Sequence, residues 1–396
     1  MTRRRLIASA APVAFAFALA PVAAIAQIQT QAGPLPPETL RAFVDTVGTL
    51  GRSYVKPVSA EELLQAAIRG MVREIDPEGG DVLIPSEMEA TPSATNTIGG
   101  VGLEMVARDG VVMVVAPLPG SPAQAAGIHP KDVLVSIDSV AVGTRTAWAV
   151  KALRGPLGST VEVGIRSIGV EGVRTLRIER GRIQPRSAEV SIAGDDVAVL
   201  RVPAFSGNTT ATIATALSAQ WQRRPFRAMV IDLRHNAGGL LEASVGVASL
   251  FLPPNAMVAE TEGRLASVNN VYLADVTRYG GTGPIPDLPA AFREMPIVVL
   301  VDEGTASGAE ILASALRDNR RARIVGHTTF GRASIQTIQR VGPDLAIRFT
   351  AAQWYPPSRR NVDKVGVSPD VVTRGKDEKS EMDAAVAEAR RMLVAK

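Results

Sequence analysis

The chain has 396 residues, of which 46% are hydrophobic, so it is long enough for two or three domains and its composition excludes a largely disordered protein. It contains no cysteine, which excludes disulfide bonds, thiolate zinc sites and a cysteine nucleophile. With only three histidines (His129, His235 and His327), the sequence argues against a multi-histidine metal site.

The first 26 residues have the pattern of an export signal. Arg3–Arg5 form a positive start, an apolar stretch runs from Leu6 to about Ala23, and Ala24–Ala26 is a small-x-small cleavage site. A membrane anchor is the alternative, but Pro12 and Pro21 interrupt the apolar stretch. We therefore predict a cleaved signal peptide and an exported, periplasmic protein.

Removal of this segment changes the charge of the chain. It holds three of the 43 basic residues and no acidic residue, so 40 basic residues remain against 39 acidic ones and the net charge falls from +4 to about +1. A chain so close to neutrality lacks the excess of basic residues that would indicate nucleic-acid binding. The sequence leaves open the oligomeric state and whether the mature chain associates with the membrane surface.

Next comes a helical segment, predicted over residues 38–95. Apolar residues recur at helical spacing between Glu38 and Ile75, and Ser59 with Glu62 fits a capping box at the start of a second helix. The helices are expected to end near Asp76, and the remaining residues read as a polar connection. The two apolar faces consist of Leu40, Phe43, Val44, Val47 and Leu50, and of Leu63, Leu64, Ala67, Ile68, Met71 and Val72.

Strand patterns then replace the helical ones. Val111–Val115, Val133–Ile137 and Val161–Ile165 are β-branched or alternating apolar runs, and Thr146–Leu153 is a helix candidate between them. These runs predict a small β-rich domain over residues 96–182.

A glycine-rich turn at residues 99–104 opens this domain. It does not lie between a strand and a helix and it lacks a phosphate-loop lysine, so nucleotide binding is a poor fit. The turn is followed by Gly-Ser-Pro-Ala at residues 120–123, by Lys-Asp-Val-Leu-Val-Ser-Ile-Asp at 131–138 and by Leu-Arg-Gly-Pro-Leu-Gly at 153–158. In this order the segments resemble a PDZ domain.

The PDZ resemblance implies a peptide site. In that family the backbone N–H groups of the glycine-rich loop receive a peptide's terminal carboxylate, and the peptide adds as a strand to a sheet edge. The loop residues would be Gly100, Val101, Gly102 and Leu103. The alternative is that these glycines are only turn residues.

From about residue 189 onward, strand and helix candidates alternate. Continuous apolar strands separated by helices predict a mainly parallel sheet flanked by helices over residues 186–375, and residues 376–396 form an amphipathic closing helix. The strand candidates are Val197–Val202, Ala228–Leu233, Ile297–Val301 and Arg323–Val325, and the helix candidates are Thr210–Gln222, Leu240–Leu252 and Ser307–Leu316. The fold class is therefore a multidomain α/β protein.

Two strand-to-helix turns of this region have a pattern suited to acyl transfer. Gly238 and Gly239 lie between a buried strand and a helix, where backbone N–H groups can stabilise an oxyanion. Ser307 lies between Ile297–Val301 and the next helix, a position typical of a nucleophile, with the Gly308 amide beside it. The simpler alternatives are a tight turn that needs positive φ and an ordinary N-cap serine.

Together with the turn at residues 330–333, these segments resemble the C-terminal processing (tail-specific) serine peptidases, which carry a PDZ domain before the protease core. The resemblance covers nearly all of the predicted mature chain and includes Tyr54-Val55, Asp76-Pro77 and residues 365–370. It implies that Ser307 is the nucleophile and that Gly308, Gly238 and Gly239 form the oxyanion hole. Further roles in the site fall on Asp318 and Gln336.

The sequence departs from this family at the general base. The family has a lysine in a Phe-Gly-Lys-Gly turn, 25 residues after the serine, whereas this chain has Arg332 in Phe-Gly-Arg-Ala. An arginine neutral at pH 7 would cost about 7–9 kcal/mol, at 1.36 kcal/mol per pKa unit. General-base catalysis contributes only about 3–5 kcal/mol. Arg332 therefore cannot replace the lysine as a base.

Three hypotheses remain for the role of this site. Another group, with His327 and His235 as candidates, deprotonates Ser307. Alternatively, Arg332 binds the oxyanion or a substrate carboxylate, which leaves weak hydrolysis. In the third, the chain is a pseudopeptidase that binds protein C-termini as an adaptor. Lys364 is a further amine in the core, but its segment gives no geometric reason to choose it.

The sequence thus predicts a serine endopeptidase that acts on polypeptide substrates or protein C-termini through an acyl-enzyme at Ser307. It implies no metal and no organic cofactor. The alternative function is a catalytically impaired, peptide-binding adaptor.

Overall fold

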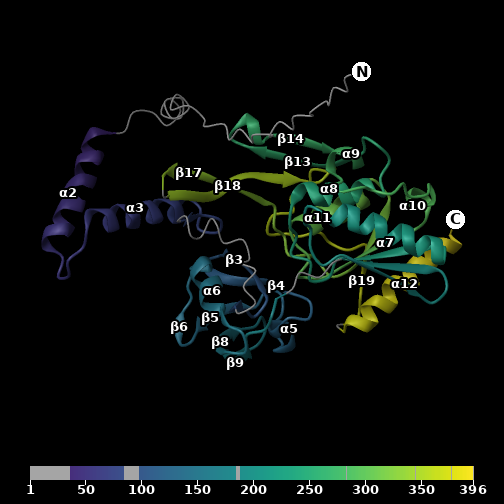
Figure 1. Cartoon of the computed structure of the whole chain (residues 1–396), viewed down its shortest axis with the longest axis horizontal. Helices are drawn as coiled ribbons and strands as arrows, with labels where there is room; N and C mark the ends of the chain where they lie inside the picture. Colours follow the sequence, from purple (N-terminus) through teal and green to yellow (C-terminus); the bar gives the residue numbers. More distant parts are fainter. Residues whose placement is uncertain are drawn as a thin grey trace, which may run out of the picture. The chain divides into compact units, whose positions relative to one another are not determined.

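The computed structural model describes residues 36–83, 98–183, 188–281, 283–343, 345–375 and 377–395 (Figure 1). The predicted signal peptide, residues 1–26, lies outside them. Within the described part of the chain, no helix is both long enough and apolar enough to cross a membrane. The chain divides into two compact units, residues 1–68 and 69–396, and each is described by itself.

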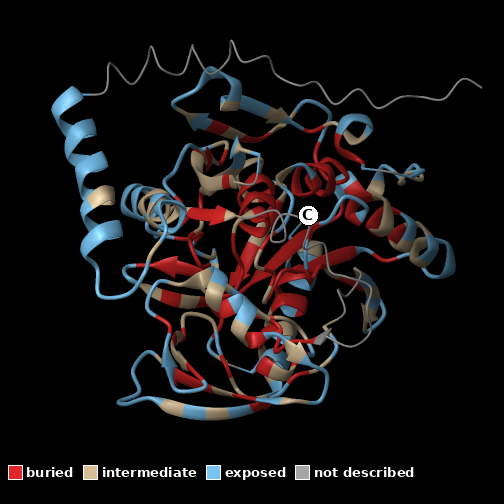
Figure 2. Cartoon of the chain, turned by 60° about the vertical axis from the view of Figure 1, so that its left-hand side comes forward, coloured by how far each residue is buried: buried red, intermediate tan, exposed pale blue. Residues whose placement is uncertain are grey.

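The first unit contains helix α2 (Pro37–Ser53) and the start of helix α3 (Ala60–Ile75). The predicted capping box is confirmed, because the Ser59 N–H donates to the Glu62 carboxylate at 2.8 Å and the Glu62 N–H donates to the Ser59 hydroxyl at 3.2 Å. The predicted amphipathic faces form, but neither helix contains a buried residue, and Figure 2 shows α2 almost entirely exposed.

The β-rich domain of the second unit has a sheet with the order β3-β4-β5-β8-β9, with β6 on β5. Strand β3 lies at the edge of this sheet, and α6 packs beside β3 and β5. The predicted helix and strands are confirmed within two residues. The elements are β2 (Ile98–Gly99), β3 (Leu103–Arg108), β4 (Val111–Pro117), α5 (Pro122–Ala125), β5 (Val133–Ile137), β6 (Val140–Ala141), α6 (Thr146–Leu153), β7 (Gly155–Pro156), β8 (Thr160–Arg166) and β9 (Arg174–Glu179).

The core contains a six-stranded sheet with the order β10-β11-β12-β15-β16-β19. Strand β10 is antiparallel to β11, and all other pairs are parallel, which confirms the predicted mainly parallel sheet. The strands are β10 (Glu189–Ala193), β11 (Val197–Arg201), β12 (Ala228–Asp232), β15 (Ile297–Val301), β16 (Ala322–Gly326) and β19 (Val371–Val372), and the packed helices are α7 (Thr209–Arg223), α8 (Leu241–Ser249), α11 (Gly308–Asp318) and α12 (Glu378–Val394).

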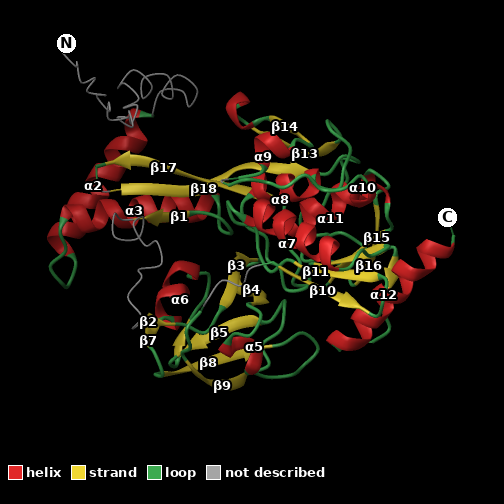
Figure 3. Ribbon diagram, turned by 45° about the vertical axis from the view of Figure 1, so that its right-hand side comes forward, coloured by secondary structure: helices red, strands yellow, loops and turns green. Residues whose placement is uncertain are grey.

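Side-chain alternation along the strands separates two hydrophobic layers. Met229 and Ile231 of β12 pack with α7, α8 and α11 on one face, whereas Ala228 and Val230 pack with α12 on the other. Figure 3 shows the sheet between these helices, and Figure 2 shows the buried residues concentrated in it. The rigid sheet places several strand ends at one edge, where the turns that carry Ser307 and Gly238 begin.

A second sheet was not predicted. It has the order β1-β18-β13-β14, with β17 also paired to β18. Residues expected to be a connection contribute β1 to it, so part of the predicted helical segment belongs to the core. Its elements and the adjoining helices are β1 (Asp81–Leu83), β13 (Met257–Gly263), the 3-10 helix η1 (Ala266–Val268), β14 (Asn270–Leu273), α9 (Val276–Tyr279), α10 (Ala291–Glu294), β17 (Ser334–Gly342) and β18 (Leu345–Tyr355).

Candidate active site

Ser307 lies in a strained turn between β15 and α11. Its φ of 53° and ψ of −117° are sparsely populated for a residue with a side chain, and such strain persists only where surrounding structure enforces it. The turn is fixed by the Ala306 N–H, which donates to the Asn236 carbonyl at 2.9 Å, and by the Thr305 hydroxyl, which donates to the Leu233 carbonyl at 2.9 Å. Ser307 is half-buried, whereas its neighbours in the turn are buried.

The turn with Gly238 and Gly239 packs directly against Ser307. A Cβ atom on Gly238 would lie 2.8 Å from the Ser307 Cβ and 2.9 Å from the Gly308 nitrogen, and its φ of 106° also favours glycine. Gly239, at φ 138°, approaches the Phe205 carbonyl so closely that a Cβ atom would overlap it. Both glycines are therefore required by the close packing of this turn.

Two backbone N–H groups at this junction have no acceptor in the part of the chain that the structure describes. The Gly238 N–H is used, because it donates to Asn236 Oδ1 at 2.8 Å. In contrast, the Gly239 and Gly308 N–H groups donate no hydrogen bond within the described residues. A Cβ atom on Gly308 would lie 3.6 Å from the Gly239 nitrogen, so the two groups are neighbours. This pair of donors is the arrangement that an oxyanion needs.

A single carboxylate oxygen brings Arg332 close to Ser307. Glu310 Oε2 accepts the Ser307 N–H at 2.8 Å and the Arg332 N–H at 2.9 Å. The two nitrogen atoms therefore cannot lie farther apart than the sum of these distances. The structure thus brings the backbones of Ser307 and Arg332, 25 residues apart in the sequence, close together.

The Arg332 side chain is crowded by protein and by other charges. Burial lowers the pKa of Arg332, and the charges of Arg348 and Arg108 lower it further, whereas Glu104 and Glu310 raise it. Desolvation by the surrounding protein raises the pKa of the Glu104 carboxyl although the residue as a whole is exposed, and the charge of Arg332 opposes that shift. Because an arginine stays protonated in proteins, Arg332 is a cation whose backbone N–H lies close to that of Ser307.

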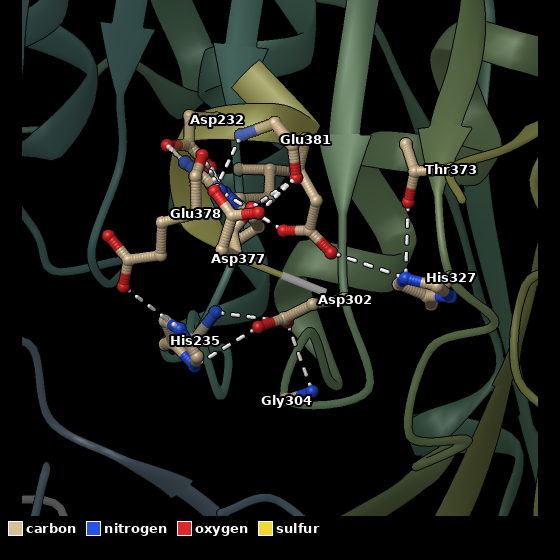
Figure 4. A network of polar contacts seen from close by, with 12 residues as sticks. Asp232, His235, Asp302, Gly304, His327, Thr373, Asp377, Glu378 and Glu381 are labelled. Atoms are coloured by element: carbon tan, nitrogen blue, oxygen red, sulfur yellow. Dashed lines mark hydrogen bonds and ion pairs between the residues drawn. The ribbon is translucent and has the colours of Figure 1, made fainter. Parts of the chain in front are cut away.

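Neither histidine contacts Ser307. His235 Nδ1 lies 3.0 Å from Asp302 Oδ2 without the alignment of a hydrogen bond, and His235 Nε2 lies 3.6 Å from Glu378 Oε1 (Figure 4). The backbone N–H of His235 donates to Asp302 Oδ1 at 3.0 Å. The same oxygen accepts the backbone N–H of Gly304 at 3.0 Å. His235 thus links the two site-forming turns and is not positioned as a base.

His327 belongs to the same polar network at the strand ends. Its Nε2 lies 3.2 Å from Glu381 Oε1 and 3.1 Å from the Thr373 hydroxyl (Figure 4). Glu381 also binds Arg234 at 3.1 Å, which in turn pairs with Asp232 at 2.9 Å. The network fastens α12 to the sheet edge, and within the described residues it contains no group of side chains suited to hold a metal ion.

Lys364 is also occupied elsewhere. Its Nζ atom contacts Glu78 at 2.6 Å and Asp109 at 3.4 Å, and the hydrogen bond to Glu78 raises the pKa of the lysine. Lys364 therefore remains protonated and is unsuited to act as a base for Ser307.

The two predicted auxiliary residues lie in different places. Asp318 ends α11, roughly 17 Å along the helix from Ser307 at 1.5 Å per residue. Its carboxylate accepts the Ser358 N–H at 3.1 Å, and no contact joins it to Ser307. Gln336 lies on β17 and lines a cleft of about 360 Å³ together with Leu240 and Leu241, which follow the Gly238 turn.

Arg108, which was not predicted as a functional residue, connects the β-rich domain to this site. Its guanidinium donates to the carbonyls of Phe330 and Gly331 at 3.2 Å and 2.5 Å and stacks on the Phe330 ring at 4.3 Å. Around it, Val106, Val115, Ala306 and Phe330 form a small hydrophobic cluster shared by the domain and the core. Nothing in the local pattern around Arg108 signals a contact with residues more than 220 positions away.

The glycine-rich loop keeps the features needed for a carboxylate site. The Gly100 N–H donates to the Gly181 carbonyl at 3.0 Å, and the Val101 and Gly102 carbonyls accept the Ala123 and Leu118 N–H groups. The Val101 and Gly102 N–H groups donate to no described residue, and the loop leads into edge strand β3.

Comparison with known proteins places this geometry in a family. Residues 196–373 match peptidase family S41, and residues 113–167 match the PDZ domain. The carboxy-terminal-processing protease of Bartonella bacilliformis is 31% identical over 338 residues, which cover 84% of this chain and 74% of that protein. The chain belongs to the carboxyl-terminal-processing protease family.

Other members of the carboxyl-terminal-processing protease family agree with this assignment. The Synechocystis protease is 33% identical over 332 residues, which cover 82% of this chain and 74% of that one. A solved structure, the photosystem II D1 C-terminal processing protease, matches with a TM-score of 0.68 and 27% identity, over 88% of this chain and 97% of its own. The predicted PDZ domain, protease core and family are thereby confirmed.

Proposed function

We propose that this protein is an exported serine endopeptidase of the C-terminal processing type in which catalysis is limited by the base. The observation that carries the proposal is the strained Ser307 beside the unpaired N–H groups of Gly308 and Gly239. The Ser307 hydroxyl would attack a scissile carbonyl, and the two N–H groups would stabilise the oxyanion. The amine then leaves with a proton, and water hydrolyses the acyl-enzyme.

The weak point of this mechanism is removal of the Ser307 proton. Arg332 is a permanent cation, Lys364 is held by two carboxylates, and both histidines contact carboxylates of the strand-end network. A water molecule is then the remaining acceptor, and acylation would be slow. Arg332 would contribute by attracting the developing oxyanion or a substrate carboxylate.

A second candidate function is a peptide-binding adaptor without proteolysis. The observation in its favour is again Arg332. A permanent cation cannot act as the base, while the rest of the site is retained and could still bind a peptide. The PDZ loop supports peptide binding in both cases, since unpaired N–H groups lead into an open sheet edge where a peptide can add as a strand.

Export to the periplasm is part of the proposal and rests on the pattern of residues 1–26. Cell fractionation of the natural chain beside one that lacks residues 2–26 tests it. Retention of the natural chain in the cytoplasm would count against export. Release of the mature chain from washed membranes would separate a free protein from one associated with the membrane surface.

The decisive experiment compares the mature chain with Ser307→Ala and Arg332→Lys on an unfolded protein substrate. Cleavage by the natural chain that disappears in Ser307→Ala supports the peptidase. Cleavage only in Arg332→Lys supports the adaptor. Labelling of Ser307 by a fluorophosphonate probe checks the nucleophile in the absence of a known substrate.

A further inference from the structure

We propose that Glu310 is a positioning residue that fixes the turn carrying Ser307 against the turn carrying Arg332. The inference rests on the proposed function, because it assigns Glu310 a role in setting the geometry of the Ser307 nucleophile. Glu310 is the fourth residue of the Ser-Gly-Ala-Glu sequence that begins α11, and its side chain is fully buried.

Four hydrogen-bond donors converge on this carboxylate. Oε2 accepts the Ser307 N–H at 2.8 Å and the Arg332 N–H at 2.9 Å, whereas Oε1 accepts the Gly331 N–H at 2.8 Å and the Thr329 hydroxyl at 2.5 Å. A carboxylate has about four lone-pair sites, so its acceptor capacity is filled.

Burial raises the pKa of the Glu310 carboxyl, whereas the hydrogen bonds it accepts lower it, and the geometry of these contacts favours the ionised form. The Thr329 hydroxyl accepts the Val367 N–H at 2.7 Å, so its own proton is free to point at Glu310. All four partners therefore donate, and a protonated carboxyl would have no acceptor among them. The resulting buried anion faces the charge of Arg332, which interacts favourably with it.

An ordinary capping box does not account for this arrangement. A capping glutamate binds only the N–H of the residue that begins its own helix, here Ser307. The other three donors come from residues 329–332, which lie 19 to 22 positions farther along the chain. Because one oxygen binds both segments, a change at Glu310 moves the nucleophile and the base position relative to each other.

The substitution Glu310→Gln tests this role, because the amide keeps the shape but replaces one acceptor oxygen with a donor. Ile311→Val is the matched control, since Ile311 is also buried in the same helix but its apolar side chain cannot form a hydrogen bond to either turn. Each chain is measured for amide hydrogen exchange at residues 305–310 and 328–334, for Ser307 labelling by a fluorophosphonate per folded molecule, and for peptide affinity.

We expect Glu310→Gln to speed amide hydrogen exchange in both segments together. Labelling of Ser307 should fall at least tenfold, because the alignment of the site is lost. Peptide affinity should stay unchanged. Ile311→Val should lower the melting temperature and leave labelling per folded molecule as in the natural chain. Unchanged exchange, or natural labelling in folded Glu310→Gln protein, would overturn the proposal.

A second variant keeps the test decisive if Glu310→Gln does not fold. Glu310→Asp retains the charge but is one methylene shorter, so it cannot reach both turns, and exchange should rise in one segment. Protection in both segments would contradict the role. If the natural chain shows no Ser307 labelling at all, the proposed peptidase fails, whereas the exchange measurement still decides whether Glu310 joins the two turns.

Discussion

Arg108 and Gly331 are joined by a hydrogen bond of 2.5 Å from the Arg108 guanidinium to the Gly331 carbonyl, across the boundary between the PDZ domain and the protease core. Gly331 immediately precedes Arg332, and its own N–H donates to Glu310. The PDZ domain and the helix that follows Ser307 therefore both bind the same short turn.

Replacing Arg108 with alanine should loosen this turn. The change removes two hydrogen bonds from a charged donor and the stacking on Phe330, and we expect a loss of about 2–4 kcal/mol in unfolding free energy with slower Ser307 labelling. Arg177→Ala is the control, because Arg177 is an exposed arginine of the same domain. Equal labelling by both variants would show that the contact does not influence the site.

Arg332→Lys should increase proteolysis. A lysine can lose its proton when it is buried, and a working general base contributes a factor of about 100 to 10,000. Activity should rise with pH as the lysine deprotonates, a profile measured with a fluorescent unfolded substrate. Arg348→Lys places a lysine at a neighbouring cation and should leave the natural rate unchanged. A rise in both variants would contradict the assignment of position 332 as the base.

Gly238→Ala should disrupt the oxyanion turn. The added Cβ atom would lie 2.8 Å from the Ser307 Cβ at a φ of 106°, so either the turn or the serine must move. We expect a loss of about 1–3 kcal/mol of stability, read from denaturant unfolding, and a strong loss of Ser307 labelling. Gly207→Ala is a fair comparison, because nothing lies within 4 Å of its Cβ position. Normal labelling in Gly238→Ala would remove this turn from the site.

His235→Gln and His327→Gln should keep Ser307 labelling per folded molecule, because both rings contact carboxylates of the strand-end network. Thermal stability should fall in each, since the contacts to α12 weaken. Labelling that disappears in one variant while its fold persists would identify that histidine as the base, against the geometry described above.

The Glu388 side chain gives a pH-dependent prediction for stability. Its hydrogen bonds to Arg391, with the charge of Arg323, lower the pKa of this carboxyl in the folded chain. The stabilisation is therefore present above the unfolded pKa of about 4.3 and is lost as the pH falls through the folded pKa. Glu388→Gln should cost about 1 kcal/mol at pH 7 and nothing well below pH 4. A difference that persists in acid would indicate a packing effect instead.

Much of the fold follows from local pattern. The strands of the parallel sheet are short, continuous apolar runs bounded by turns, and Ser307 and Gly238 follow two of them directly. The second sheet escaped this reasoning because β17 and β18 are long and only partly buried, so pairing with each other defines them more than apolar alternation does.

Some contacts of the site are signalled by the local sequence, and others arise only from the tertiary structure. The Ser-x-x-Glu spacing of Ser307 and Glu310 is a capping signal that was available in the sequence, although its link to residues 329–332 was not. The histidines looked suitable as bases because they lie in site-forming segments. Only the tertiary structure reveals that carboxylates of α12 occupy them.

The position of β3 has a consequence for substrate length. This strand leads from the glycine-rich loop to Arg108, six residues that span roughly 20 Å at 3.3 Å per residue. A polypeptide held by its last carboxylate and laid along β3 would reach the protease turn only after a tail of similar length. The length of β3 would then set a minimum length for the unfolded C-terminal tail of a substrate. A folded protein with a shorter tail would not reach the protease turn.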